Sequence, residues 1–228
     1  ADFQNLMHVY LDAVFYPNIY KREEIFRQEG WNYHLEQKEG PLKYNGVVYN
    51  EMKGAFSSPD EVLEREIMNH LFPDTTYGCE SGGDPKNIPD LPYENFLNFH
   101  RTYYHPSNSY IYLYGDMDVD EYLTFIDEHY LKDFDKKQID SSWEKQEPFT
   151  EVKRVEEYYP VGENDSEEEK TYLSYNAVIG DSLDAKLYLG FEILNRVLFD
   201  APGAPVKKAL MDAQIGKDIQ SSYDNGIM

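Results

Sequence analysis

Histidine and glutamate are the side chains in this sequence that could bind a metal ion or move protons at neutral pH. None of the histidines in this sequence opens a His-Glu-x-x-His or His-x-x-Glu-His zinc motif. The nearest approach is the run Phe-Ile-Asp-Glu-His at 125–129, where Phe125 stands in place of the first ligand and cannot bind a metal. His100 and His105 are five residues apart, which puts them on different helix faces and favours stacking or capping roles.

Other common catalytic signatures are missing from the sequence as well. The glycine-rich run Ser81–Pro85 lacks the lysine and the strand–helix context of a phosphate-binding loop, and no Gly-x-Ser-x-Gly elbow occurs. Cys79 is the single cysteine, which excludes an internal disulfide framework and a cysteine-based zinc site. The acidic run Gly162–Lys170 lacks the spacing and the central glycine of a calcium loop, so we interpret it as a solvated hairpin tip.

One carboxylate breaks the pattern of its surroundings. Glu51 falls on the apolar stripe of the helix predicted over 44–56, four residues after Val47 and four before Ala55. Burying an unpaired carboxylate costs several kcal/mol unless a cation or hydrogen-bond donors compensate it. An ion pair with a lysine or arginine would compensate it, and so would a metal ion. Structural ion pairs are commoner than metal sites, so periodicity by itself favours the ion pair.

Composition and charge narrow the kinds of partner. The 228 residues include 21 Lys and Arg against 43 Asp and Glu, a formal charge of −22, with a pI near 4.5. Such a surface repels phosphate, which argues against nucleic acid and anionic membranes and favours cationic ligands such as basic peptides or metal ions. No run of about 18 uncharged apolar residues occurs, so no membrane-spanning helix is predicted. The 21 Tyr and 12 Phe fall mostly on inward positions, which indicates core packing.

The elements that must position Glu51 follow from hydrophobic periodicity and capping signals. Ser58 and Glu61 form a capping box with Pro59 at the first helical position, and Asp118 resembles a second cap. The sequence predicts helices over 2–16, 21–28, 44–56, 58–72, 93–104, 118–131, 183–199 (capped near Ser182) and 205–214. It predicts strands over 31–36, 110–114, 152–159 and 171–179, and a final strand from 218. Interleaved helices and strands indicate an α+β or α/β fold.

Several motifs occur in a fixed order along the chain. The stretch Gly46–Gly54 (GVVYNEMKG) carries Glu51, and it is followed by Ser81–Pro85 (SGGDP), Tyr103–Asn108 (YYHPSN) and Tyr114–Asp116 (YGD). The first helical stretch, Asp2–Phe15, and two later segments, Leu189–Phe191 and Ala201–Val206, fit the same series. In this order and spacing the motifs resemble those of the pitrilysin/insulinase-type zinc metallopeptidase family, specifically its presequence-protease subgroup. The resemblance covers nearly the whole chain.

The resemblance implies an α+β fold in which a two-layer mixed sheet packs against helices, the pitrilysin-like domain. The chain would hold one incomplete domain and part of a second similar one. Residues 1–131 would be the C-terminal part of the first, metal-ligand-bearing domain, and residues 151–228 the N-terminal part of the second. Residues 132–150, which are polar and without a clear period, would be the linker between them.

The resemblance also implies a zinc site. Members of the family bind one zinc ion through two histidines of an inverted His-x-x-Glu-His helix and a glutamate of a later helix, and Glu51 matches that third ligand. Such a ligand set leaves a fourth position for water, which the metal acidifies. The general base would be the glutamate of the inverted motif, expected upstream of Ala1, so no catalytic residue is expected in this chain. Tyr77 and the Gly82–Gly83 loop would approach the metal.

We therefore expect this chain to be a fragment of a zinc metalloendopeptidase that cuts peptides inside a closed chamber, and to be inactive by itself. Its expected partners are peptide substrates, basic ones included, and the remaining domains of its own full-length chain, with no nucleic acid and no membrane. One alternative is a non-catalytic pitrilysin-like subunit that binds peptides or scaffolds a complex. Another is an acidic interaction domain in which Glu51 pairs with an arginine. A single cysteine and no visible signal favour the cytoplasm, while an organelle stays open because the true N-terminus is not seen.

Overall fold

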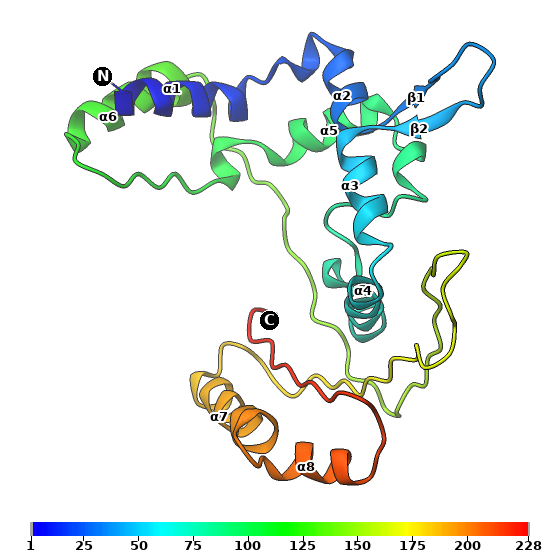
Figure 1. The fold of residues 1–228 in the computed structure, drawn as a ribbon. Coiled ribbons are helices and arrows are strands. Elements are labelled where there is room, and N and C mark those ends of the chain that lie inside the picture. Colours follow the sequence, from blue (N-terminus) through cyan, green and yellow to red (C-terminus); the bar gives the residue numbers. More distant parts are fainter. Residues whose placement is uncertain (1, 228) are drawn as a thin grey trace. The chain divides into compact units, whose positions relative to one another are not determined.

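The computed structural model describes residues 2–227, which are mostly helical with one small sheet (Figure 1). The α-helices are α1 (Asp2–Phe15), α2 (Glu23–Glu29), α3 (Val47–Ala55), α4 (Pro59–Leu71), α5 (Tyr93–Tyr103), α6 (Val119–Ile126), α7 (Ala185–Asn195) and α8 (Pro205–Asp212). The strands are β1 (Asn32–His34) and β2 (Lys43–Asn45). Helices α6 and α7 each continue into a π-helical turn, over Asp127–Leu131 and Arg196–Asp200.

The backbone packs into two compact units, each assembled from three segments of the chain. The first unit comprises Ala1–Glu64, Glu80–Trp143 and Glu156–Glu167. The second comprises Arg65–Cys79, Glu144–Val155 and Glu168–Met228. Residues 132–150 contain no helix or strand. The division into residues 1–131 and 151–228, joined by a linker, stays a prediction.

The core of the first unit lies between α1 and α6 with its π-helical turn. Met7, Leu11 and Phe15 recur on one face of α1 and are buried against Ile126 and Tyr130. The Asp118 carboxylate accepts a hydrogen bond from the backbone N–H of Glu121 at 3.1 Å, which caps α6 as predicted. The predicted helices 2–16 and 118–131 are confirmed.

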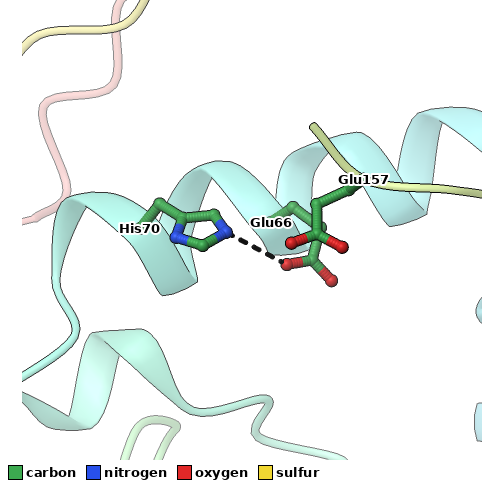
Figure 2. Close-up of side chains that lie close together, drawn as sticks. All are labelled: Glu66, His70 and Glu157. Atoms are coloured by element: carbon green, nitrogen blue, oxygen red, sulfur yellow. Dashed lines mark ion pairs between the residues drawn. The ribbon is translucent and has the colours of Figure 1, made fainter. Parts of the chain in front are cut away.

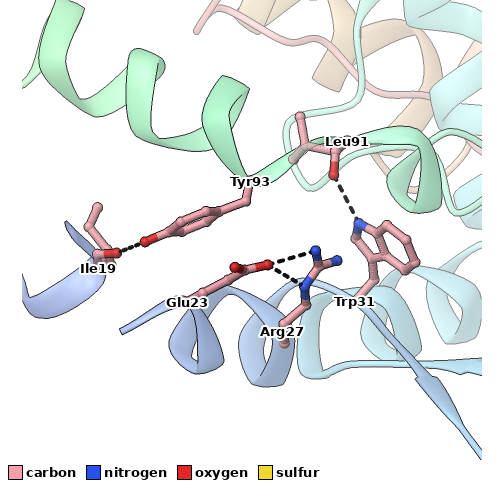
Figure 3. Close-up of polar contacts among 6 residues, drawn as sticks. All are labelled: Ile19, Glu23, Arg27, Trp31, Leu91 and Tyr93. Carbon is pink, nitrogen blue, oxygen red and sulfur yellow. Dashed lines mark hydrogen bonds and ion pairs between the residues drawn. The ribbon is translucent and has the colours of Figure 1, made fainter. Parts of the chain in front are cut away.

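A second packed corner joins α2, the β1–β2 hairpin and α5 (Figure 3). Arg27 pairs with Glu23 at 2.7 Å, and its guanidinium lies 5.3 Å from the centre of the Trp31 ring. The Trp31 indole Nε1 donates a hydrogen bond to the Leu91 carbonyl at 3.1 Å, and the Tyr93 hydroxyl donates to the carbonyl of Ile19. These contacts fix the segment before α3 against the start of α5.

The β1–β2 hairpin is antiparallel, with Tyr33 opposite Tyr44. The predicted strand over 31–36 is present but shorter. The helix predicted over 44–56 begins at Val47 instead, because Tyr44 and Asn45 pair with β1. Cross-strand pairing of tyrosines is favourable, and here it outweighs the helical period of the sequence.

Four predicted strands are wrong for the described part of the chain. Residues 110–114, 152–159 and 171–179 and the segment after 218 run without strand pairing. Tyr110 is 105% exposed. A strand is stable only when a neighbour accepts and donates its backbone hydrogen bonds, and β1 and β2 are the only pair among residues 2–227. The predicted two-layer mixed sheet is therefore not formed here. What holds is a helical structure with a small sheet, which is compatible with a fragment of the expected domain.

The second unit contains α7 and α8. The helices predicted over 183–199 and 205–214 are confirmed, but the cap of the first is Asp184 and not Ser182. The Asp184 carboxylate accepts hydrogen bonds from the backbone N–H groups of Lys186 and Leu187, both at 3.1 Å. No helix within residues 2–227 is long and apolar enough to cross a membrane.

Candidate functional site

The candidate ligand Glu51 lies in the middle of α3, and the start of that helix is fixed by contacts between backbones. Gly46 precedes α3 with a φ of 152°. A Cβ at this position would lie 2.7 Å from the carbonyl carbon of Gly30 and 2.8 Å from the Cα of Trp31. Only glycine lets the two backbones approach this closely. The α2–β1 corner therefore determines where α3 begins.

Hydrogen bonds hold the first turn of α3 in the same place. The backbone N–H of Tyr49, one of the free donors of the first turn, donates to the Gly30 carbonyl at 3.3 Å. The Asn50 side-chain amide donates to the Asn45 side chain of β2 at 2.9 Å. Glu51 follows directly, so its backbone position is set by the hairpin and by α2.

Glu51 is exposed, and the apolar stripe on which it was predicted to lie is not buried. Helix α3 has no buried residue, and Val47 is 44% exposed. The inward stripe predicted from periodicity is therefore wrong for the described chain. Among residues 2–227 no lysine, arginine or histidine forms an ion pair with Glu51. The predicted alternative of a structural ion pair with an arginine thus gains no support.

The Gly82–Gly83 loop lies against the Met52 side chain of α3. A Cβ at Gly82 would press on the Met52 thioether, reaching its Cε at 2.9 Å. Gly83 has a φ of 91°, which favours glycine at the turn. The loop was expected near the metal, and the structure brings it to the residue that follows Glu51. Tyr77 packs against Phe72 with ring centres 5.8 Å apart.

His100 and His105 have structural roles, as their spacing predicted. The His100 ring stacks on Tyr104, with ring centres 4.7 Å apart. Its Nε2 lies 2.8 Å from the Val14 carbonyl, which can only accept, so Nε2 carries the proton. The His105 Nδ1 accepts a hydrogen bond from the backbone N–H of Ser107 at 3.1 Å and caps the short turn that follows.

A glutamate–histidine pair on α4 was not predicted from the sequence. His70 and Glu66 lie one turn apart on this helix (Figure 2), and the His70 Nε2 is 3.7 Å from the Glu66 Oε2. Glu66 also pairs with Arg65 at 2.5 Å. The signal in the sequence was the spacing of four residues, which places two side chains on one face of a helix.

Comparison with known proteins decides the family. The family model described as "Peptidase M16 inactive domain" matches residues 90–227, more than half of the chain. This chain belongs to the M16 family of peptidases. The predicted membership of the pitrilysin/insulinase-type metallopeptidases is therefore confirmed. Glu51 lies outside the matched range.

Curated relatives of the M16 chain include presequence proteases, as the order of motifs predicted. "Protein HypA" of Clostridium perfringens is 54% identical over 224 residues, covering 98% of this chain and 23% of that protein. "Presequence protease 1, chloroplastic/mitochondrial" of Arabidopsis thaliana is 41% identical, covering 97% of this chain and 21% of that protein. "Presequence protease, mitochondrial" of Xenopus laevis is 39% identical, covering 99% and 22%. The chain thus spans between a fifth and a quarter of the length of these relatives.

Proposed function

We propose that this chain is part of a longer zinc-dependent M16 endopeptidase that hydrolyses peptides inside a closed chamber, and that Glu51 is one of its zinc ligands. Family membership supports a metallopeptidase. The observation that carries the role of Glu51 is an exposed carboxylate without a cationic partner, held on a helix whose start is fixed by the Gly46–Gly30 contact.

The donor chemistry of Glu51 fits a zinc ion, but one carboxylate is not a complete site. Zinc sites of hydrolytic enzymes use three protein ligands and keep a fourth position for water. We propose that two histidines of an inverted His-x-x-Glu-His motif, outside this chain, supply the other two ligands, and that the glutamate of that motif is the general base. When bound, the zinc ion would lower the pKa of its water and polarise the peptide carbonyl.

The contribution of this chain is to orient one ligand. The backbone contacts at Gly46 and Gly30 restrict how α3 can shift, and the Gly82 loop rests on the neighbouring Met52. Ligand carboxylates must be held within a few tenths of an ångström of their working position. We expect isolated residues 1–228 to bind zinc weakly and to cleave no peptide, because a single ligand competes poorly with water.

We propose domain bounds and a substrate class for this peptidase as well. Residues 1–131 and 151–228 would be parts of two pitrilysin-like domains joined by the segment 132–150, and both would complete their mixed sheets with parts of the longer chain. The formal charge of −22 suits basic peptides as substrates. The relatives that name a presequence protease are consistent with peptide substrates.

The test is Glu51→Gln in the full-length protein, with Glu64→Gln as the matched control. Glutamine keeps the size of the side chain but replaces the carboxylate with a neutral amide, which is a much poorer zinc ligand. Removing a ligand should lower zinc affinity and peptide cleavage by at least about a hundredfold, since lost supporting contacts already cost 10- to 100-fold. Glu64 is also exposed, on the neighbouring helix α4, and its replacement should change neither quantity. Full zinc content by elemental analysis in Glu51→Gln would refute the assigned role.

A second candidate is a non-catalytic subunit that binds peptides or scaffolds a complex. The observation in its favour is that the family model matching residues 90–227 describes an inactive domain. The zinc content of the purified full-length protein distinguishes the two candidates. A non-catalytic subunit would contain less than one zinc ion per molecule and would not cleave unfolded peptides. If this is found, Glu51→Gln should have no effect on peptide binding.

The comparisons do not support the cytoplasm as the working compartment. Both eukaryotic relatives described above are named after organelles, one mitochondrial and one chloroplastic or mitochondrial, whereas the bacterial relative carries no compartment in its name. For a eukaryotic source we propose an organelle, which fractionation of cells expressing the full-length protein with a C-terminal tag would test.

A further inference from the structure

One face of the β1–β2 hairpin carries an exposed pair of tyrosine rings. Tyr33 and Tyr44 lie directly across from each other on the two strands, so both side chains project from the same face. Their ring centres are 5.5 Å apart, and the ring planes are inclined by 31°. Tyr33 is 61% exposed and Tyr44 is 45% exposed. Much of the surface of both rings is therefore open to a ligand.

An exposed carboxylate, that of Asp90, lies close to this pair of rings. Asp90 precedes Leu91, whose carbonyl accepts the hydrogen bond of the Trp31 indole, and the Trp31 ring centre is 6.0 Å from that of Tyr44. The pKa of the Tyr44 phenol is raised, first of all by the neighbouring Tyr33, and the charge of Asp90 adds to the shift. Within residues 2–227 no lysine or arginine pairs with Asp90 or lies over either tyrosine ring.

The same corner of the structure shows how such groups hold a guanidinium. The guanidinium carbon of Arg27 lies 5.3 Å from the centre of the Trp31 ring, and Arg27 pairs with the Glu23 carboxylate at 2.7 Å (Figure 3). The face of an aromatic ring attracts a cation, and a carboxylate accepts hydrogen bonds from the guanidinium. Tyr44 and Asp90 offer the same combination of ring and carboxylate, but without an arginine from this part of the chain.

We propose that Tyr33, Tyr44 and Asp90 form a binding site for an arginine side chain of the peptide substrate, called the arginine site below. The inference rests on the proposal that the parent protein binds peptides, but not on Glu51 or zinc. The site adjoins the helix that carries Glu51, because the Tyr44 ring centre is 5.9 Å from that of Tyr49 in α3. A peptide bound at the arginine site would therefore lie beside α3.

Two arguments select an arginine side chain over other ligands. The guanidinium is planar, so it can stack on a tyrosine ring while its N–H groups point at a carboxylate. The ammonium group of lysine is a compact, strongly hydrated charge and lacks this geometry. The formal charge of −22 attracts cationic peptides and opposes both anionic ligands and a second copy of this chain.

Binding of two matched peptides by the full-length protein tests the proposal. One fluorescein-labelled, unfolded peptide carries arginine at regular intervals, and the other carries citrulline, a neutral side chain of the same shape, at those positions. Fluorescence anisotropy gives the dissociation constant of each peptide, in EDTA so that no peptide is cut and at about 0.15 M salt to screen long-range attraction. The ratio of the two constants measures the preference for arginine.

Substitutions at the arginine site should lower this preference. Asp90→Asn should lower it about two- to fivefold, as expected for an exposed ion pair. Glu64→Gln removes another exposed charge and should leave the preference unchanged. Tyr44→Leu should lower the preference about two- to fivefold by removing an exposed cation–π contact, whereas Tyr44→Phe keeps the aromatic face and should preserve it. The melting temperature shows whether each variant folds, and Asp90→Asn decides the matter alone if Tyr44→Leu does not.

Two outcomes would overturn the proposal. If Asp90→Asn prefers arginine as strongly as Glu64→Gln does, arginine is attracted by the overall charge only, or another part of the protein covers the hairpin. If a lysine peptide binds as tightly as the arginine peptide, the site does not recognise the guanidinium.

Failure of this proposal can be told apart from failure of the proposed function. The preference for arginine is measured in EDTA and needs neither zinc nor cleavage. Full zinc content in Glu51→Gln would refute the ligand role of Glu51 and would leave the arginine site standing. An unchanged preference in Asp90→Asn would refute the arginine site and would leave the zinc ligand standing.

Discussion

Replacing Gly46 by alanine should destabilise the unit that carries Glu51 by several kcal/mol. With its φ of 152°, Gly46 occupies a region that other residues enter only at a cost of about 1–3 kcal/mol. The added Cβ would lie 2.7 Å from the Gly30 carbonyl carbon and 2.8 Å from the Trp31 Cα, well inside the usual carbon–carbon separation of about 3.5–4.0 Å. Both atoms belong to the backbone and cannot rotate away, so overpacking adds about 1–3 kcal/mol.

The combined loss of about 2–6 kcal/mol is a large part of the 5–15 kcal/mol by which a typical protein is stable. Urea denaturation of the full-length protein measures it, and Trp31 provides a fluorescence signal next to the altered position. Zinc affinity should fall together with stability, because a displaced α3 carries Glu51 with it.

Gly54→Ala is the matched control, since Gly54 lies on the same helix and has no neighbouring atom within 4 Å of an added Cβ. Alanine in a helix interior gains about 0.5–1 kcal/mol over glycine. Relative to the unmodified protein, the urea concentration at half-unfolding should therefore fall for Gly46→Ala and rise for Gly54→Ala. If Gly46→Ala is as stable as the unmodified protein, or behaves like Gly54→Ala, the close approach of the two backbones is not what positions α3.

Three further predictions concern a buried leucine, a buried tyrosine and a helix cap. Leu97 of α5 is 5% exposed, so Leu97→Ala should cost about 2–5 kcal/mol by denaturation, whereas the exposed Asn95→Ala on the same helix should cost less than about 0.5 kcal/mol. Burial, reinforced by Asp12 and Tyr16, raises the pKa of Tyr130 above 10.0. A raised phenol pKa means that the folded state holds the proton longer, so this contribution to stability is complete below pH 10 and is lost as pH rises through the folded pKa. Tyr130→Phe should flatten the alkaline fall in melting temperature while costing about 1 kcal/mol at neutral pH for its lost hydrogen bond to the His8 carbonyl; an unchanged alkaline profile would contradict this. Finally, Asp184→Ala should lower stability by about 1 kcal/mol by removing the cap of α7, while Ser182→Ala should have no such effect.

The helices that bury an apolar face against other residues of this chain were predictable from the sequence. The pattern of Met7, Leu11 and Phe15 predicted α1, and the Asp118 cap marked the start of α6. Both signals are local, because a cap and a helical stripe involve residues within a few turns. The cap of α7 was misplaced because Ser182 and Asp184 are both good capping residues, and two positions separate them.

Features that depend on distant segments were not predictable. A strand needs a partner, and the aromatic alternation of 110–114 gives no sign that the partner is missing from the described chain. The exposure of α3 is a related case, because its contacts among residues 2–227, such as that of Met52 with the Gly82 loop, leave none of its residues buried. The sequence alone does not show that a side chain at position 46 would clash, because the clash is with the backbone of Gly30 and Trp31 at the α2–β1 corner.

The candidate site was predicted from the family resemblance more than from physics. Periodicity singled out Glu51 for a reason that the structure does not bear out, namely burial on an inward stripe. The motif around Glu51 pointed to the same residue independently, and the family was confirmed. Its role as a ligand stays a prediction until the zinc content of Glu51→Gln is measured.

The unpaired segment 110–114 also bears on how such a chain can be made and kept in solution. Its side chains alternate along an extended backbone, Tyr112 and Tyr114 are each 84% exposed, and the segment contains no proline or charge that would deter a foreign strand. An extended apolar stretch of this kind can pair with strands of other molecules unless a strand of its own protein covers it. A recombinant piece in which no strand covers this stretch should precipitate through it, and Tyr112→Lys should keep the piece soluble.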